Sequence, residues 1–138
     1  MAASALKKRD CSILPEQAYP GFAGMTGLKA YTGLLHIAQM RDGDTVFVSG
    51  GVGSVVCQIA RLKGNRVIGA AGSARKAAFL RDTLKLDGVI DCKAEPSLTK
   101  ALAREAPDGI DVYFDNVGGD HLQAAIRSAP RAAASWPT

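Results

Sequence analysis

Short apolar runs alternate along this chain with longer segments of helical spacing, and this alternation constrains the fold more than any other feature. The sequence predicts strands at 45–48, 66–70, 89–91 and 109–115. It predicts helices at 27–39, 54–63, 75–84 and 97–106. The connections between successive strands are too long for hairpins, so the strands run parallel with right-handed crossovers. The chain is therefore predicted to form a doubly wound α/β domain, with helices on both faces of a parallel sheet.

The 138 residues have room for one domain of this kind. We expect a lead-in over residues 1–23, the α/β domain over 24–126 and an irregular tail over 127–138, where strand and amphipathic-helix spacing both stop. A complete sheet of this architecture has about six strands. Only four are recognisable in the sequence, so the domain is expected to be incomplete.

Composition and charge argue against several classes of protein. Charged residues at 41, 42 and 44 interrupt the most apolar region, so no membrane-spanning helix is predicted. Basic residues near the amino terminus precede no signal-like apolar stretch, which favours a cytoplasmic location. The net charge of +4 comes from dispersed basic residues with few aromatic residues between them, so no nucleic-acid partner is expected. Cys11, Cys57 and Cys92 form no CxxC or Cys/His pattern, and neither a disulfide framework nor a metal site is predicted.

A glycine-rich turn joins the first predicted strand to the helix that follows it. Such a turn lets the backbone approach a pyrophosphate, whose charge then lies against the amino end of the helix. Aligned with the GxGxxG fingerprint, Gly53 takes the last position and Gly50 the middle one, while Val48 stands where the first glycine should be. The match is partial, and a tight turn without a ligand is the alternative. The predicted pyrophosphate-binding residues are Gly50, Gly51, Val52 and Gly53.

The end of the second predicted strand indicates which dinucleotide the turn serves. An acidic residue about 20 positions beyond the glycines would bind the ribose 2′-hydroxyl of NAD. No acid stands there; the segment instead offers Ser73, Arg75 and Lys76, which suit the 2′-phosphate of NADPH. The alternative is that the two cations are exposed charges on the first turn of the next helix. NADPH is the predicted cofactor.

Three segments resemble one enzyme family. They read GMTGLKAY at 24–31, VVCQIARLKG at 55–64 and GIDVYFDNVGG at 109–119. The chain is similar there to the zinc-independent medium-chain dehydrogenases/reductases, and among them to the NADPH-dependent alkenal double-bond and leukotriene/prostaglandin reductase group. The resemblance implies a Rossmann-type fold and metal-free reduction of the carbon–carbon double bond of an α,β-unsaturated aldehyde or ketone. It also implies that Lys76 contacts the 2′-phosphate and that Asn116 lies by the cofactor.

The chain departs from the family pattern in four respects. Its glycine turn is three residues shorter than the family's usual SGAAGAVGS, which leaves open whether the turn still binds pyrophosphate. Cys92 stands where the family commonly has a tyrosine that helps to hold the 2′-phosphate, and Thr26 stands where proline is frequent. The family also has a preceding catalytic domain and further strands, which are not recognisable in this sequence.

Two functions from different classes follow from these patterns. The first is an NADPH-dependent enone or enal reductase, of which this chain is the cofactor-binding domain and in which Asn116 to Gly119 border the nicotinamide. The second is a truncated, non-catalytic nucleotide-binding remnant or an interaction subunit. No catalytic residue is identified: His36 and His121 have no partner pattern, and Asp111 and Asp115 share strand spacing but are expected to be scaffold residues. A homodimer is left open.

Overall fold

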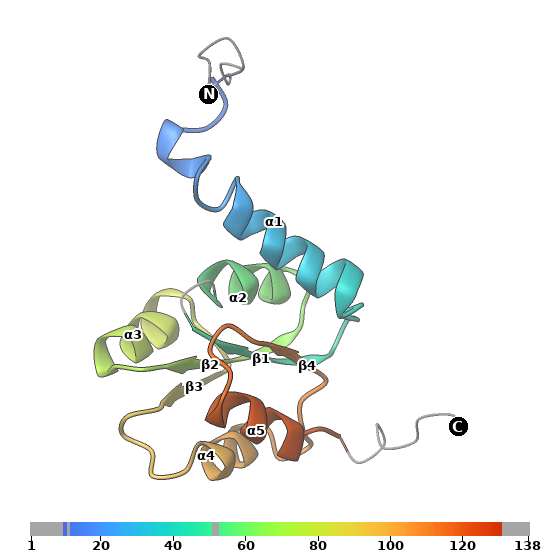
Figure 1. The fold of residues 1–138 in the computed structure, drawn as a ribbon, viewed down its shortest axis with the longest axis vertical. Coiled ribbons are helices and arrows are strands. Elements are labelled where there is room, and N and C mark those ends of the chain that lie inside the picture. Colours follow the sequence, from blue (N-terminus) through green and yellow to red (C-terminus); the bar gives the residue numbers. More distant parts are fainter. Residues whose placement is uncertain (1–9, 11, 51–52, 131–138) are drawn as a thin grey trace.

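A four-stranded parallel sheet forms the centre of the computed structural model, which describes residues 10, 12–50 and 53–130 (Figure 1). The strands are β1 (Thr45–Ser49), β2 (Arg66–Ala71), β3 (Gly88–Asp91) and β4 (Val112–Phe114), and their order across the sheet is β3-β2-β1-β4. The predicted parallel α/β architecture is confirmed. Because the chain steps outward from β1 to β3 and then returns to the other side of β1, the strand order reverses between β1 and β4. Ligands of doubly wound folds bind beside such a reversal, outside the carboxyl ends of the strands.

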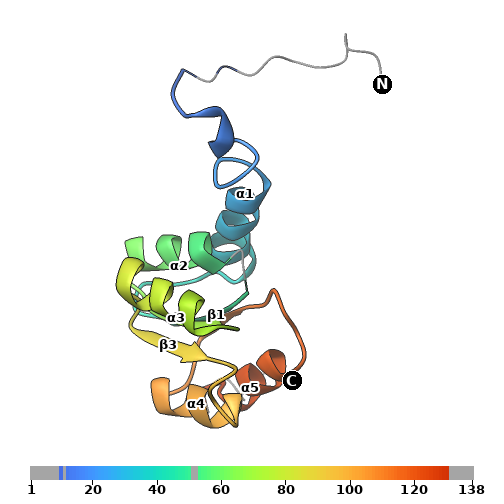
Figure 2. The same ribbon diagram turned by 90° about the vertical axis from the view of Figure 1, so that its left-hand side faces the viewer.

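Helices cover both faces of the sheet. The α-helices are α1 (Met25–Thr32), α2 (Gly53–Leu62), α3 (Ala74–Ala78), α4 (Leu98–Glu105) and α5 (Asp120–Arg127). Two π-helical segments, η3 (Gly33–Ile37) and η4 (Phe79–Thr83), extend α1 and α3, and a 3₁₀ turn, η2 (Glu16–Ala18), precedes α1. Figure 2 shows α2 and α3 on one side of the sheet, and α4 and α5 on the other. The molecule is thus a three-layer sandwich.

Side-chain alternation along β1 explains why both faces need a cover. Val46 and Val48 pack with α1 and α2 in one buried cluster. Phe47, between them in sequence, points to the opposite face, where it packs with α4 and α5 and stacks on Tyr113 at 5.2 Å between ring centroids. Successive side chains of a strand face opposite ways, so a strand with three apolar residues in a row must be covered twice.

The structure differs from the sequence-based expectation mainly around β4. That strand was predicted over 109–115 but is confined to 112–114, because Gly109 has a positive φ of 95° and the Ile110 N–H donates to Ser128 O rather than to the sheet. Helix α5 was not predicted. None of the helices in the described part of the chain has both the length and the apolar character that crossing a bilayer requires.

Asp111 and Asp115 do not form an acid pair. The Asp111 carboxylate accepts the Thr45 N–H at the amino end of the sheet (2.8 Å), whereas Asp115 accepts the Gly118 N–H at the carboxyl end (2.7 Å). Their predicted scaffold role agrees with these backbone partners.

Candidate functional site

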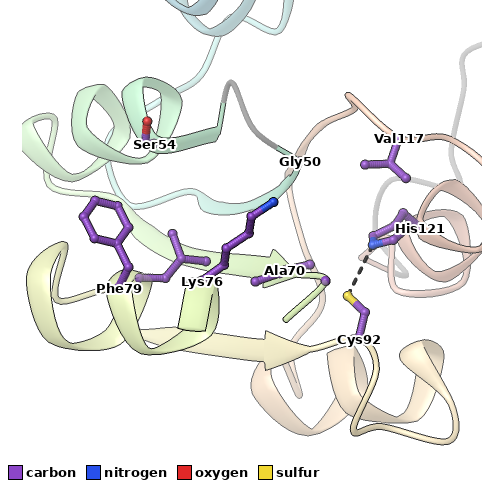
Figure 3. Close-up of a pocket in the computed structure, with 11 residues that line it drawn as sticks. Gly50, Ser54, Ala70, Lys76, Phe79, Cys92, Val117 and His121 are labelled. Carbon is purple, nitrogen blue, oxygen red and sulfur yellow. Dashed lines mark hydrogen bonds between the residues drawn. The ribbon is translucent and has the colours of Figure 1, made fainter. Parts of the chain in front are cut away.

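A pocket of about 360 Å³ opens at the carboxyl ends of β1, β2 and β3 (Figure 3). Its size is within the usual range for small-molecule sites. It is lined by Gly50, Ser54, Ala70, Ala71, Gly72, Lys76, Phe79, Leu80, Cys92, Val117 and His121. These residues come from β2, α2, α3 with η4, α5 and the segments that follow each of the four strands. The pocket therefore lies where the order of the strands predicts a ligand site.

Gly50, directly after β1, brings the first strand's turn against the segment after β4. Its φ is +82°, a conformation that side chains other than glycine's rarely adopt. A Cβ at this position would lie 3.0 Å from the Cβ of Asn116 and 3.1 Å from a methyl group of Val117. The absence of a side chain is thus required twice, once by the backbone angle and once by the close approach.

Of the other predicted glycine-turn residues, the structure describes Gly53 alone. Gly53 is the first residue of α2, so the partial positive charge at the amino end of that helix faces the pocket, where Ser54 forms part of the wall. Gly51 and Val52 lie outside the described residues.

Asn116 is fixed by bonds from two sides. Its side-chain Nδ2 donates to the carbonyl oxygen of Ser49 at 2.8 Å, and its Oδ1 accepts from Nζ of Lys29 in α1 at 3.2 Å. Its backbone N–H donates to Oγ of the fully buried Ser49 at 3.3 Å. The carboxamide consequently has one defined orientation beside the reversal of strand order.

An ionised carboxylate shapes the turn after Asn116. Oδ1 of Asp115 accepts the N–H groups of Gly118 (2.7 Å) and Val117 (2.9 Å) and the hydroxyl of Tyr113 (2.8 Å). The bond from Gly118 contributes most to lowering the pKa of Asp115 below its ordinary 3.8. Burial raises the pKa of Tyr113 to about 12, so its phenol remains a donor at neutral pH. The turn is held by charge-assisted hydrogen bonds.

On the β2 side, the structure separates the three predicted 2′-phosphate residues. Lys76 lines the pocket, with its side chain pointing into it in Figure 3. Ser73 caps α3, since its Oγ accepts the Lys76 N–H at 3.4 Å, and Arg75 is exposed; neither belongs to the lining. Within the described part of the chain, the lining contains no carboxylate, and Lys76 takes part in no salt bridge.

Cys92 and His121 form a contact in the pocket wall that no sequence pattern predicted. Sγ of Cys92 lies 3.4 Å from Nε2 of His121. Burial, and secondarily the charge of Asp91, raise the pKa of the Cys92 thiol. The two residues are 29 positions apart, one following β3 and the other in α5. The sequence showed no partner pattern around His121, and the structure places its ring against Cys92.

No group in the described part of the chain resembles a metal centre: three or more His, Cys, Asp or Glu side chains nowhere gather in the way that ligands would. The polar side chains of the pocket are suited instead to an anionic organic ligand. Lys76 supplies charge, the amino end of α2 supplies a partial positive charge, and the alanines that end β2 supply an apolar floor.

Comparison with known proteins gives this pocket a context. The family model described as zinc-binding dehydrogenase matches residues 51–134. Prostaglandin reductase 1 of Mus musculus is 50% identical over 116 residues, which cover 82% of this chain and 35% of that protein. The NADP⁺-dependent 2-alkenal reductase of Nicotiana tabacum is 42% identical over 116 residues, covering 82% of this chain and 34% of that protein.

Among solved structures, CurA from Vibrio vulnificus in complex with NADPH matches with a TM-score of 0.74 and 46% sequence identity. The match covers 79% of this chain and 33% of CurA. The chain spans about a third of the length of the curated relatives that it matches.

Proposed function

The chain belongs to the zinc-binding dehydrogenase family, and from this premise we propose that it is the NADPH-binding part of a reductase acting on the carbon–carbon double bond of α,β-unsaturated aldehydes or ketones. The predicted resemblance to the medium-chain reductases is confirmed by the family match and by relatives that include prostaglandin and 2-alkenal reductases. The observation that carries the proposal is the pocket itself: Gly50 packs tightly against Asn116, and Lys76 enters without an acidic neighbour.

The residues present fit a dinucleotide phosphate. A pyrophosphate needs close access to backbone N–H groups, and Gly50 provides a turn without a side chain next to the first residues of α2. Gly53 belongs to the same proposal because it begins that helix. Gly51 and Val52 are retained as proposed ligands on the sequence alone.

Lys76 is the proposed determinant of the choice between NADPH and NADH. Its ammonium group, on α3 at the end of β2, can bind a 2′-phosphate, and no carboxylate of the described lining competes for it or repels that phosphate. The Ser73 hydroxyl already accepts the Lys76 N–H, yet it retains its own hydrogen to donate. Arg75 is exposed beside it and is proposed as a secondary attraction for the phosphate.

Asn116 is proposed to border the nicotinamide end, together with Val117, Gly118 and Gly119. Ser49 and Lys29 hold its carboxamide in place, so it can contact a ligand without first losing side-chain entropy. NADPH, when bound, supplies the hydride for reduction. The described residues contribute binding and orientation.

A pair of lysine variants tests the cofactor assignment. Lys76→Gln is expected to weaken NADPH binding by on the order of 10- to 100-fold, the value of a charge-assisted contact, while NADH binding changes little. Lys100→Gln removes the same charge from α4, on the opposite face of the sheet, and is expected to change neither. Titration calorimetry with each nucleotide, supported by ligand-induced thermal shift, measures both effects. Equal losses for NADPH and NADH, or no binding of NADPH to the unaltered chain, would overturn the assignment.

Oxidation of NADPH by the chain in the presence of an enone would exclude the second function predicted by the sequence, a non-catalytic nucleotide-binding chain. Because the chain spans about a third of its relatives' length, binding without oxidation is expected of an isolated cofactor-binding part as well as of a non-catalytic chain. A cytoplasmic location and an enone or enal as the partner of NADPH are part of the proposal, and a homodimer is left to measurement of the molar mass.

A further inference from the structure

A nucleophile and a base meet in the wall of the nucleotide pocket. Sγ of Cys92 and Nε2 of His121 are 3.4 Å apart, and both side chains line the cavity (Figure 3). A thiol within hydrogen-bond reach of an imidazole is the arrangement by which proteins activate cysteine. Cys57 makes a natural contrast, because it is 1% exposed within the core and burial raises its pKa to about 12.

We propose that Cys92 and His121 form a reactive pair that is alkylated by α,β-unsaturated carbonyl compounds, and that the adduct blocks the nucleotide pocket. The choice of electrophile rests on the proposed function, since a reductase of this class meets such compounds as substrates. The proposed alkylation itself does not depend on hydride transfer from NADPH. The pair would make the domain sensitive to an excess of its own substrate class.

The reaction is a balanced addition. In the tautomer of His121 that carries its hydrogen on Nδ1, Nε2 accepts the thiol proton. The sulfur electron pair then bonds to the β-carbon of the enone, the carbon–carbon π bond breaks, and the α-carbon takes up the proton. Nothing is oxidised or reduced, and no third reactant is needed.

His121 is needed because the thiol is a poor nucleophile without it. Burial and the charge of Asp91 raise the pKa of Cys92, so a free thiolate is scarce at neutral pH. Asp91, the last residue of β3, repels negative charge on the sulfur, while Lys76 is the basic side chain, other than His121 itself, in the described lining. A neighbouring base that takes the proton during attack avoids the need for a preformed thiolate.

Occlusion of the pocket follows from the position of the sulfur. Cys92 follows β3 and lines the same cavity as Gly50 and Lys76. An alkyl group on Sγ would occupy part of a volume of about 360 Å³ that the nucleotide needs. Nucleotide and electrophile should therefore exclude one another.

Alkylation by methyl vinyl ketone, followed by peptide mass spectrometry, tests the proposal. At pH 7 the adduct is expected on Cys92 and not on Cys57. His121→Gln should slow the reaction at Cys92 by on the order of 10- to 100-fold, with a rate that climbs toward the unaltered protein's as the pH rises above 8. A merely structural His121 would not give that pH profile. No adduct at Cys92, or equal rates with and without His121 at pH 7, would overturn the proposal.

NADP⁺ serves as the protecting nucleotide because it cannot reduce the probe. At about ten times its Kd it should slow alkylation of Cys92 about tenfold. Alkylated protein should in turn lose its NADP⁺-induced thermal shift, whereas Cys92→Ser treated with the same probe should keep it. If NADP⁺ binds and Cys92 reacts at an undiminished rate, the pair lies outside the nucleotide site and the proposal of blockage fails. If NADP⁺ does not bind at all, the cofactor assignment fails, while alkylation assisted by His121 is still decided by the first experiment.

Discussion

The two ends of the sheet use the same strands in opposite ways. At the amino ends of the strands, carboxylates accept hydrogen bonds from backbone N–H groups. Asp111 accepts the Thr45 N–H and Asp87 accepts the Val67 N–H, each at 2.8 Å. At the carboxyl ends, the strands lead into a cavity that Lys76 and His121 face. The backbone N–H groups of Thr45 and Val67 at the first end are satisfied by carboxylates, whereas at the second end the side chains of Lys76 and His121 are directed at a space for a ligand. Stability and binding are therefore expected to respond to different ends of the molecule.

Two glycines offer the largest test of that difference. Gly43 precedes β1 with φ of +88° and Gly50 follows it with φ of +82°, but only at Gly50 would a Cβ meet other atoms. Alanine at either position should cost about 1–2 kcal/mol of unfolding free energy through the backbone angle. Gly50→Ala must also push Asn116 and Val117 back by a few tenths of an ångström. The lost fit should weaken NADPH binding by on the order of 10-fold, which corresponds to about 1.4 kcal/mol. Chemical denaturation and NADPH titration of both variants measure the two quantities.

Gly43→Ala is the matched control, since it imposes the same strain where nothing lies within 4 Å of the added methyl group. It should keep NADPH affinity. Equal loss of affinity in the two variants would show that strain in the strand, and not the approach of Gly50 to Asn116, limits binding.

The sequence predicted some elements of the fold closely and missed others, and the reasons are physical. Strand β1 was predicted to within one residue because Val46, Phe47 and Val48 form a contiguous apolar run before glycine. Helix α5 was missed because Gly118 and Gly119, both with positive φ, suggest the end of an element rather than the start of a helix. Its alanines, Ala124 and Ala125, are buried against α4 only through tertiary packing, which no local pattern records.

Within the site, the sequence predicted residues of three separate segments, Gly50, Lys76 and Asn116, and missed the contacts that join residues of different elements. Gly50 and Lys76 follow strands and carry recognisable chemistry. His121 and Cys92 have no shared motif, and their contact depends on α5, which was not predicted, lying beside the end of β3. The hydrogen bond between Lys29 and Asn116, which are 87 residues apart, likewise depends on two elements that only the folded chain brings together. Contacts between elements are fixed by topology, so their chemistry becomes visible only in the folded chain.

Asp87 tests the amino end. Asp87→Ala leaves the partly buried Val67 N–H without its carboxylate partner, and should lower the unfolding free energy by about 1.5–2 kcal/mol without changing NADPH affinity. Asp82→Ala, at an exposed position of η4, is the matched control and should have little effect on either. Denaturant titration with and without NADPH measures both. If Asp87→Ala binds NADPH more weakly under conditions in which it is fully folded, then a change at the amino ends of the strands alters binding at their carboxyl ends.

Lys29 tests whether the bonds that orient Asn116 matter at the carboxyl end. Lys29→Met removes the donor to Oδ1 of Asn116 and should weaken NADPH binding about two- to fivefold, since the lost contact is exposed. Lys63→Met removes the same charge from the residue after α2 and corrects for general attraction of an anion. Calorimetric titration at two salt concentrations separates the contributions. The same loss in both variants would reduce the role of Lys29 to net charge.

The smallest expected effect is that of Asp115 on the free energy of unfolding, and the direction of its pKa shift decides how this effect changes with pH. Because hydrogen bonds from Gly118 and Val117 lower the pKa of Asp115 in the folded protein, its ionised form favours folding. That stabilisation is present in full above the ordinary value of 3.8 and is lost as the pH falls through the lower folded value. Asp115→Asn should therefore be less stable by under about 1 kcal/mol at pH 7, because the group is exposed, and should converge with the unaltered protein in acid. Asp108→Asn removes a carboxylate at an exposed position before Gly109 and is the matched control for the loss of one negative charge. A constant difference between Asp115→Asn and the unaltered protein from pH 7 into acid would mean that the carboxylate shapes the Asn116 turn by its geometry and not by its charge.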